Sequence, residues 1–203
     1  MSLVETSKLN NIIINNINIT SQENNIIKSF EHFYQNNQNT YIFLDLISSK
    51  SVISIRLIDH FITKYSKTNK ICYKINENNI EQSFNVYSSY KQQLKTYQKK
   101  YFDPFSRGER IPYFINDICI ITTISQLNFF KWFISKKIYD YILSNQNSID
   151  SEMNQKNRIS INTKISKKKI NKPIKKSSYI PSISNHTIIN NVKKPEKIIV
   201  SFN

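Results

Sequence analysis

Glycine and alanine are almost missing from this 203-residue chain, which has one glycine and no alanine. Loops that hold the phosphates of nucleotides need several glycines, because the backbone must approach the ligand closely. The composition therefore excludes a recognisable P-loop and a GxGxxG turn. The chain is rich in isoleucine, asparagine, lysine, tyrosine and phenylalanine, the residues of AT-rich codons, so codon usage explains part of the net charge of +15.

Cysteine and histidine are scarce as well, with two and three copies. Cys72 and Cys119 are isolated in the apolar contexts ICYKI and DICII, a pattern typical of small buried side chains in a reducing compartment. They and the histidines, His32, His60 and His186, lack the spacing of zinc ligands. We expect no metal and no cofactor. A nucleophilic or metal-binding pair of Cys72 and His60 is a remote alternative.

Carboxylate motifs give little reason to expect an enzyme. No Asp or Glu is followed two residues later by Lys, so the carboxylate-x-Lys signature of metal-dependent nucleases is missing. A nuclease of another kind that uses Asp103, Glu109 and Asp117 is the remaining catalytic alternative. Our prediction is that the protein is not an enzyme.

Long hydrophobic runs are absent too. No stretch approaches eighteen uncharged apolar residues, and the N-terminal sequence MSLVETSKLN lacks the basic and apolar regions of a signal peptide. We therefore expect a soluble, intracellular protein without a transmembrane segment.

The strongest folding signal is the segment from Thr122 to Leu143. It is apolar around most of a helical circumference, and Thr122 or Thr123 can cap its start. No glycine or proline interrupts it, so we expect one central helix in which Trp132 is buried.

Weaker periodic patterns surround this segment and predict an α+β fold, mainly helical, with a few short strands or a small hairpin. Tyrosines and one leucine recur every three or four residues between Tyr87 and Tyr101, and Asp103 before Pro104 should end that helix. By the same criteria we expect helices over residues 24–34 and 52–65, strands over 41–47 and 71–75, and a hairpin from 110–114 and 118–121.

Apolar periodicity also suggests the domain boundaries. We expect a loose or strand-like lead over residues 1–22, a folded α+β core over 23–145, and a disordered basic tail over 146–203. Residues 1–150 carry 17 basic and 12 acidic residues, whereas residues 151–203 carry 12 and 2. Codon bias should act on both parts of the chain alike, so it does not explain this asymmetry in charge. The asymmetry favours a polyanionic partner, nucleic acid or an anionic membrane surface, with a solvated tail that has no partner as the alternative. The basic centre of the tail consists of Lys167, Lys168, Lys169, Lys172, Lys175 and Lys176.

A second basic group is expected on the core. Lys91 and Lys95 border the tyrosine stripe, and the loop FDPFSRGERIP adds Arg107 and Arg110. These arginines either bind a phosphate or pair with nearby carboxylates. Gly108, the single glycine, suggests a positive φ or a close backbone approach, with a plain turn as the alternative.

The segments YKQQLKTYQKKYFDPFSRGERI and TTISQLNFFKWFI, together with ISIRLIDHFITKYSKTN, resemble an uncharacterised family of nucleocytoplasmic large DNA viruses, the giant-virus group. The similarity covers roughly residues 51–143. It implies a viral factory in the host cytoplasm or a virion as the setting, and it implies no activity or catalytic residue.

Two functions fit these features. The first is a non-enzymatic accessory protein that binds DNA or RNA without sequence preference, through the basic tail and the basic face of the core. The alternative is a virion assembly or scaffold protein that acts through contacts with other viral proteins.

Overall fold

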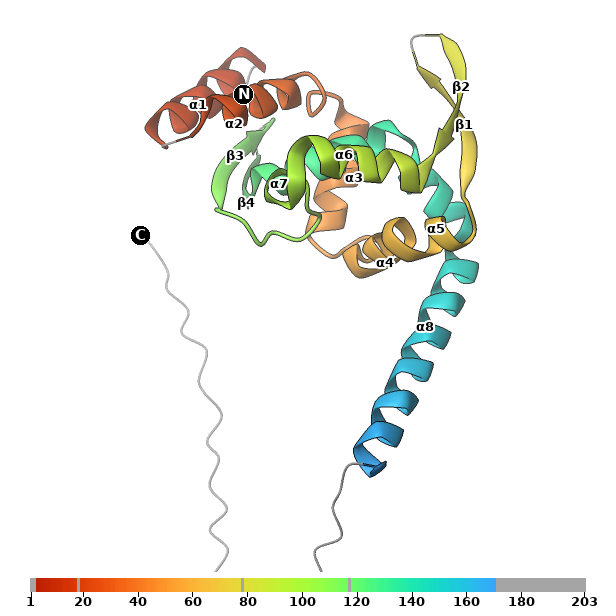
Figure 1. Ribbon diagram of the computed structural model, residues 1–203. Helices are drawn as coiled ribbons and strands as arrows, with labels where there is room; N and C mark the ends of the chain where they lie inside the picture. Colours follow the sequence, from red (N-terminus) through yellow and green to blue (C-terminus); the bar gives the residue numbers. More distant parts are fainter. Residues whose placement is uncertain (1–2, 18, 78, 117, 171–203) are drawn as a thin grey trace, which may run out of the picture. The chain divides into compact units, whose positions relative to one another are not determined.

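The computed structural model describes residues 3–17, 19–77, 79–116 and 118–170 (Figure 1). The chain divides into two units, residues 1–163 and 164–203, and in the second unit only the helical residues 164–170 are described. The described helices are α1 (Leu3–Asn16), α2 (Ser21–Glu31), α3 (Asn37–Ile47), α4 (Ile55–His60), α5 (Ser66–Thr68), α6 (Val86–Tyr101), α7 (Ile124–Ser135) and α8 (Ile138–Ile170), with a π-helical turn, η1 (Phe61–Tyr65), before α5. The described strands are β1 (Cys72–Glu77), β2 (Ile80–Asn85), β3 (Ile111–Ile115) and β4 (Ile118–Thr122).

Helix α7 is buried almost all round, as its apolar circumference predicts. Thr123 caps it and accepts a hydrogen bond from the backbone N–H of Gln126. Trp132 is buried as expected, and its indole N–H donates to the hydroxyl of Ser89 at 3.0 Å. The predicted cap and the predicted burial of Trp132 are both confirmed.

The expectation of a single helix from Thr122 to Leu143 is wrong, because the helix stops after Ser135. Lys137 has φ 57°, a left-handed conformation that costs about 1 to 2 kcal/mol in a non-glycine residue. The bend lets α8 start in a new direction with Ile138 and Ile142 fully buried. Burial of two isoleucines, at about 1.5 to 3 kcal/mol each, outweighs that cost.

Helices α2 and α3 pack on α7. The hydroxyl of Tyr34, just after α2, donates to the carbonyl of Leu127 at 2.8 Å, and the rings of Phe43 and Phe130 lie 5.6 Å apart. Residues 41–47 were expected to form a strand and instead lie in α3. The side chain of Asn36 caps this helix, and its buried residues Thr40, Phe43 and Leu46 recur at a helical spacing.

Helix α1 replaces the loose or strand-like lead expected over residues 1–22, and it lies along β3 (Figure 1). The Asn10 amide donates to the carbonyl of Phe114 and accepts from its N–H, both at 2.8 Å. The hydroxyl of Thr6 donates to the carbonyl of Asn116. Long-range polar contacts therefore hold α1, so apolar periodicity could not reveal it.

The strands form two separate antiparallel hairpins, β1–β2 and β3–β4. The predicted hairpin over 110–121 and the predicted strand over 71–75 are confirmed. Strand β2, with the polar sequence IEQSFN, was not expected. The α+β class is therefore confirmed. The helix predicted over 52–65 is present as α4 followed by η1, and α6 ends at Tyr101 as expected.

Helix α8 continues through residue 146, where the disordered tail was expected to begin. Ile149 is fully buried, Met153 packs against the core, and the side chain of Asn69 donates to Glu152 at 3.2 Å. The boundary expected at residue 145 is therefore wrong. A single apolar side chain in each of the next two turns, Ile149 and then Met153, keeps α8 packed against the core. Residues 171–203, with the rest of the predicted tail, lie outside the described residues.

We expect Ile149→Ala to lower the free energy of unfolding by about 2 to 5 kcal/mol, because it removes a fully buried side chain from α8. Leu143→Ala on the same helix is the control. Leu143 is 46% exposed, so its replacement should change stability by only about 1 kcal/mol or less. Urea denaturation measures both, and equally small effects would show that α8 does not pack beyond Asn145.

Candidate nucleic-acid interface

Helix α6 presents a row of lysines because its other face is fixed in the core. The side chain of Asn85 caps its start by accepting from the N–H of Ser88. Tyr90 packs against Trp132, with ring centroids 6.3 Å apart. Lys91 and Lys95, one turn apart, are therefore held in solvent. Gln98, with φ 56° and ψ 175°, interrupts the helix, so the row does not continue in register to Lys99.

Two lysines that sequence reasoning missed extend this row. Lys67 of α5 lies over the ring of Tyr87, with its Nζ 5.5 Å from the centroid, and Tyr87 is one turn before Lys91. Lys64 of η1 is three residues before Lys67. We call Lys64, Lys67, Lys91 and Lys95 the α6 basic surface. All four side chains are exposed, and none makes an ion pair with any side chain that the structure describes.

Acidic residues are few around this surface. Between residues 60 and 102 the sequence has only Glu77 and Glu81, both on the hairpin β1–β2. Glu77 pairs with Lys136, and Glu81 pairs with Lys74 at 2.8 Å. These two carboxylates are therefore neutralised locally and form no ion pair with the α6 basic surface, whereas Asp59, just before this stretch, interacts electrostatically with Lys64. The long acid-free stretch after His60 is the sequence signal that could have identified Lys64 and Lys67.

Asp59, at the end of α4, is a half-buried carboxylate that interacts electrostatically with Lys64 of this surface. Burial is the main cause that raises its pKa, and the neighbouring Asp103 adds to the effect. Arg107, Lys64 and Lys99 act in the opposite direction. Cations from η1, α6 and the following loop therefore gather around one half-buried carboxyl group, which sequence reasoning also missed.

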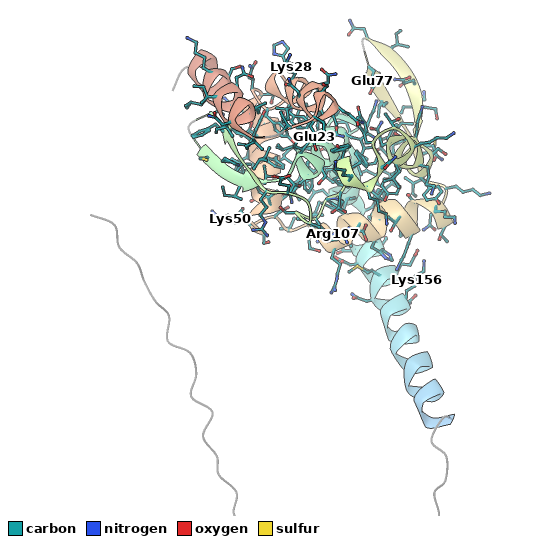
Figure 2. The ribbon with its side chains drawn as sticks, turned by 60° about the vertical axis from the view of Figure 1, so that its left-hand side comes forward. Glu23, Lys28, Lys50, Glu77, Arg107 and Lys156 are labelled. Carbon is teal, nitrogen blue, oxygen red and sulfur yellow. The ribbon has the colours of Figure 1, made fainter. Side chains whose placement is uncertain are left out.

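Of the two roles expected for Arg107, phosphate binding or pairing with a carboxylate, the structure shows the pairing. Its Nε donates to Oδ2 of the buried Asp103 at 3.0 Å, and Nη2 donates to Oδ1 at 2.5 Å. The guanidinium also lies over the ring of Phe105. The fork holds the loop between α6 and β3, while Arg107 remains on the surface (Figure 2).

Arg110 and Gly108 behave differently from Arg107. Arg110 is exposed, and no carboxylate among the described side chains pairs with it. Gly108 does not have a positive φ, and a Cβ placed on it would meet Ser125 Oγ at an ordinary 3.7 Å. The plain turn alternative is therefore the correct one for Gly108, and its backbone does not require glycine.

The tail lysines are described only in part. Lys167, Lys168 and Lys169 lie in the last turns of α8, but their side chains are not described. Lys172, Lys175 and Lys176 lie outside the described residues. The structure brings Lys91 and Lys95 together, holds Arg107 in an ion pair, and leaves the tail predictions as predictions.

Cysteine, histidine and acidic residues do not form a metal site within the described residues. Contrary to expectation, Cys72 and Cys119 are exposed, because both lie on two-stranded hairpins with a solvent-facing side. His60 is buried, and its Nε2 has no hydrogen-bond partner among the described atoms. Burial first, and then Lys64 and Lys156, lower the pKa of His60.

The chain belongs to the Family of unknown function (DUF7197), whose model matches residues 7–201. A similar protein is the uncharacterized protein L507 of Acanthamoeba polyphaga mimivirus, which is 35% identical over 148 residues. This similarity covers 70% of the present chain and 57% of the viral protein, so the chain spans little more than half of that relative. The expected resemblance to an uncharacterised giant-virus family is confirmed.

No solved structure matches the chain. Among the described helices, none combines the length and the apolar character that crossing a bilayer requires.

We expect Arg107→Lys to lower the free energy of unfolding by about 1 kcal/mol, because lysine keeps the charge but loses the two-bond fork to Asp103. The estimate is at the low end for charged hydrogen bonds because Arg107 is largely exposed and solvent screens the pair. Arg110→Lys is the control and should leave stability unchanged. Urea denaturation of both variants measures this, and equal stabilities would contradict a clamping role for Arg107.

Proposed function

We propose that this chain is a non-enzymatic viral accessory protein that binds nucleic acid through its basic tail and the α6 basic surface. The observation that carries the proposal is the α6 basic surface itself, four exposed lysines without an ion pair to any described side chain. Unpaired lysines concentrated on one side of a fold attract polyanions and release their counterions on binding. Its setting would be a viral factory in the host cytoplasm, or the virion.

Lysine chemistry indicates what kind of binding to expect. An ammonium group contacts a phosphate as a point charge and does not read base edges, whereas specific readout uses planar groups such as guanidinium or amide. The four side chains that define the α6 basic surface are all lysines. We therefore propose binding to DNA or RNA without sequence preference.

The tail would supply additional phosphate contacts. Residues 164–176 carry seven lysines and no acidic residue. Such a segment adds electrostatic affinity that depends strongly on salt and little on sequence. The alternative function, virion assembly through contacts with other viral proteins, is supported by an apolar strand edge on β4.

The α6 basic surface can be tested by the salt dependence of binding to a duplex DNA of random sequence. We expect Lys91→Gln with Lys95→Gln to reduce the slope of log affinity against log salt by about 2, since each phosphate contact adds about 0.9. The matched control is Lys8→Gln with Lys28→Gln, which removes the same charge from α1 and α2. Equal slopes for the two variants would contradict a role for the α6 surface.

The tail contribution is measured in the same assay on the full chain. Replacing Lys167, Lys168, Lys169, Lys172, Lys175 and Lys176 by glutamine should reduce the slope by about 5 if all six contact phosphates. Loss of all measurable affinity in this variant would assign binding to the tail alone. An unchanged slope would exclude the tail from binding.

A further inference from the structure

The two edges of the β3–β4 hairpin differ in how they are protected. On the β3 edge, the Asn10 amide occupies both backbone groups of Phe114, and Thr6 occupies the carbonyl of Asn116. Helix α1 thus takes the place of a neighbouring strand and closes this edge. No described residue does the same for β4.

The register shows which backbone groups of β4 remain open. Phe114 lies opposite Cys119, and Asn10 binds the backbone groups of Phe114 that point away from β4. In an antiparallel pair, opposite residues turn their backbone groups the same way, inward or outward. The N–H and C=O of Cys119 therefore point away from β3, as do those of Ile121 two residues on. Pro112, which lacks an N–H, lies opposite Ile121 and fits this assignment.

The side chains of β4 do nothing to discourage pairing. Natural sheets usually protect an open edge with a charge, a proline or a bulge, and the hairpin β1–β2 carries the cross-strand pair Lys74–Glu81. Strand β4, with the sequence ICIIT, has no charged residue or proline. Ile121 is 62% exposed, so this edge is both open and apolar.

An apolar groove of about 490 Å³ runs beside this edge, between β4 and α3. Ile118, Ile120 and Ile121 form one wall, and Leu44 and Ile47 belong to the other. Tyr41 of α3 also lines the groove and is 71% exposed. The same patch therefore contains both an apolar hollow and protruding apolar side chains, which is the self-complementarity that a twofold interface requires.

Charge at the groove also favours a second copy of this chain over an unrelated strand. Asp45 and Lys50 line the groove, and neither has an ion pair with a described side chain. In a twofold dimer, Asp45 of one protomer and Lys50 of the other lie on the same interface, and so do Lys50 of the first and Asp45 of the second. The strand itself carries no charge, so no like-charged side chains face each other across two paired β4 strands.

We propose that two copies of the chain form a homodimer by antiparallel pairing of their β4 strands, with Ile120 on the twofold axis. In this register Cys119 exchanges both backbone hydrogen bonds with Ile121 of the partner subunit, and Ile121 does so with Cys119 of the partner subunit. The two hairpins become one four-stranded sheet.

Sedimentation velocity of the full chain, freed of nucleic acid at high salt, tests the dimer. The wild type should dimerise in the micromolar range. Ile121→Lys should weaken the dimer by about 100-fold or more, because each substitution enters the twofold interface twice. Tyr41→Lys should weaken the dimer as well. Because Tyr41 lies on α3 and outside the sheet, this variant still tests the dimer if Ile121→Lys disturbs the hairpin. Circular dichroism and the emission of Trp132 confirm folding.

The matched control is Val52→Lys, since Val52 is 68% exposed and does not line the groove. This variant should dimerise like the wild type. A monomeric wild type, including one whose groove takes a strand from another protein, would overturn the proposal. So would a dimer that survives both Ile121→Lys and Tyr41→Lys, or one that Val52→Lys weakens equally.

The register has its own test by oxidation. In a chain with Cys72→Ser and Cys119→Ser, Ile120→Cys should form a covalent dimer, because residues facing each other across the axis come within disulfide range. A dimer that gives no disulfide at position 120, but links through Cys119 in the wild type, would overturn the Ile120 axis.

Discussion

The burial of α7 is the constraint on which the rest of this fold depends. Its rings form a continuous cluster in which Phe129 contacts Phe130, Trp132 and Phe133. Its buried polar side chains fix the neighbouring loop, since Gln126 donates to the carbonyl of Pro104 and Asn128 to the carbonyl of Tyr101. Two unpaired amides in such a core would each cost about 1 to 3 kcal/mol, so the end of α6 must lie where it does. The position of the α6 lysines follows from these contacts.

Features set by local chemistry could be predicted from the sequence. The cap at Thr123, the burial of Trp132, the end of α6 at Tyr101 and the hairpin β3–β4 all follow from residue type and spacing within a few positions. Features set by distant partners could not. Helix α1 depends on Asn10 meeting Phe114, 104 residues away, and the left-handed Lys137 follows from packing on both sides of it.

The candidate interface shows the same division. Lys91 and Lys95 were identifiable because they flank an apolar stripe on their own helix. Lys64 and Lys67 join them only because the fold brings η1 and α5 against α6, where Lys67 covers Tyr87. Whether Arg107 would bind phosphate or a carboxylate was open in the sequence, because Asp103, four residues before it, and Glu109, two residues after it, are both possible partners for an arginine that could also bind an anion. The turn after Phe102 decides it, by placing buried Asp103 beside the guanidinium.

In our proposal, the folded domain itself contacts phosphate at the α6 basic surface. Acetylation of lysines in the full chain, with and without saturating duplex DNA, followed by mass spectrometry, tests it most directly. We expect DNA to protect Lys67, Lys91 and Lys95 from modification and to leave Lys8 and Lys28 as reactive as in the free protein. Protection confined to lysines beyond residue 163, with the α6 lysines as reactive as before, would contradict it.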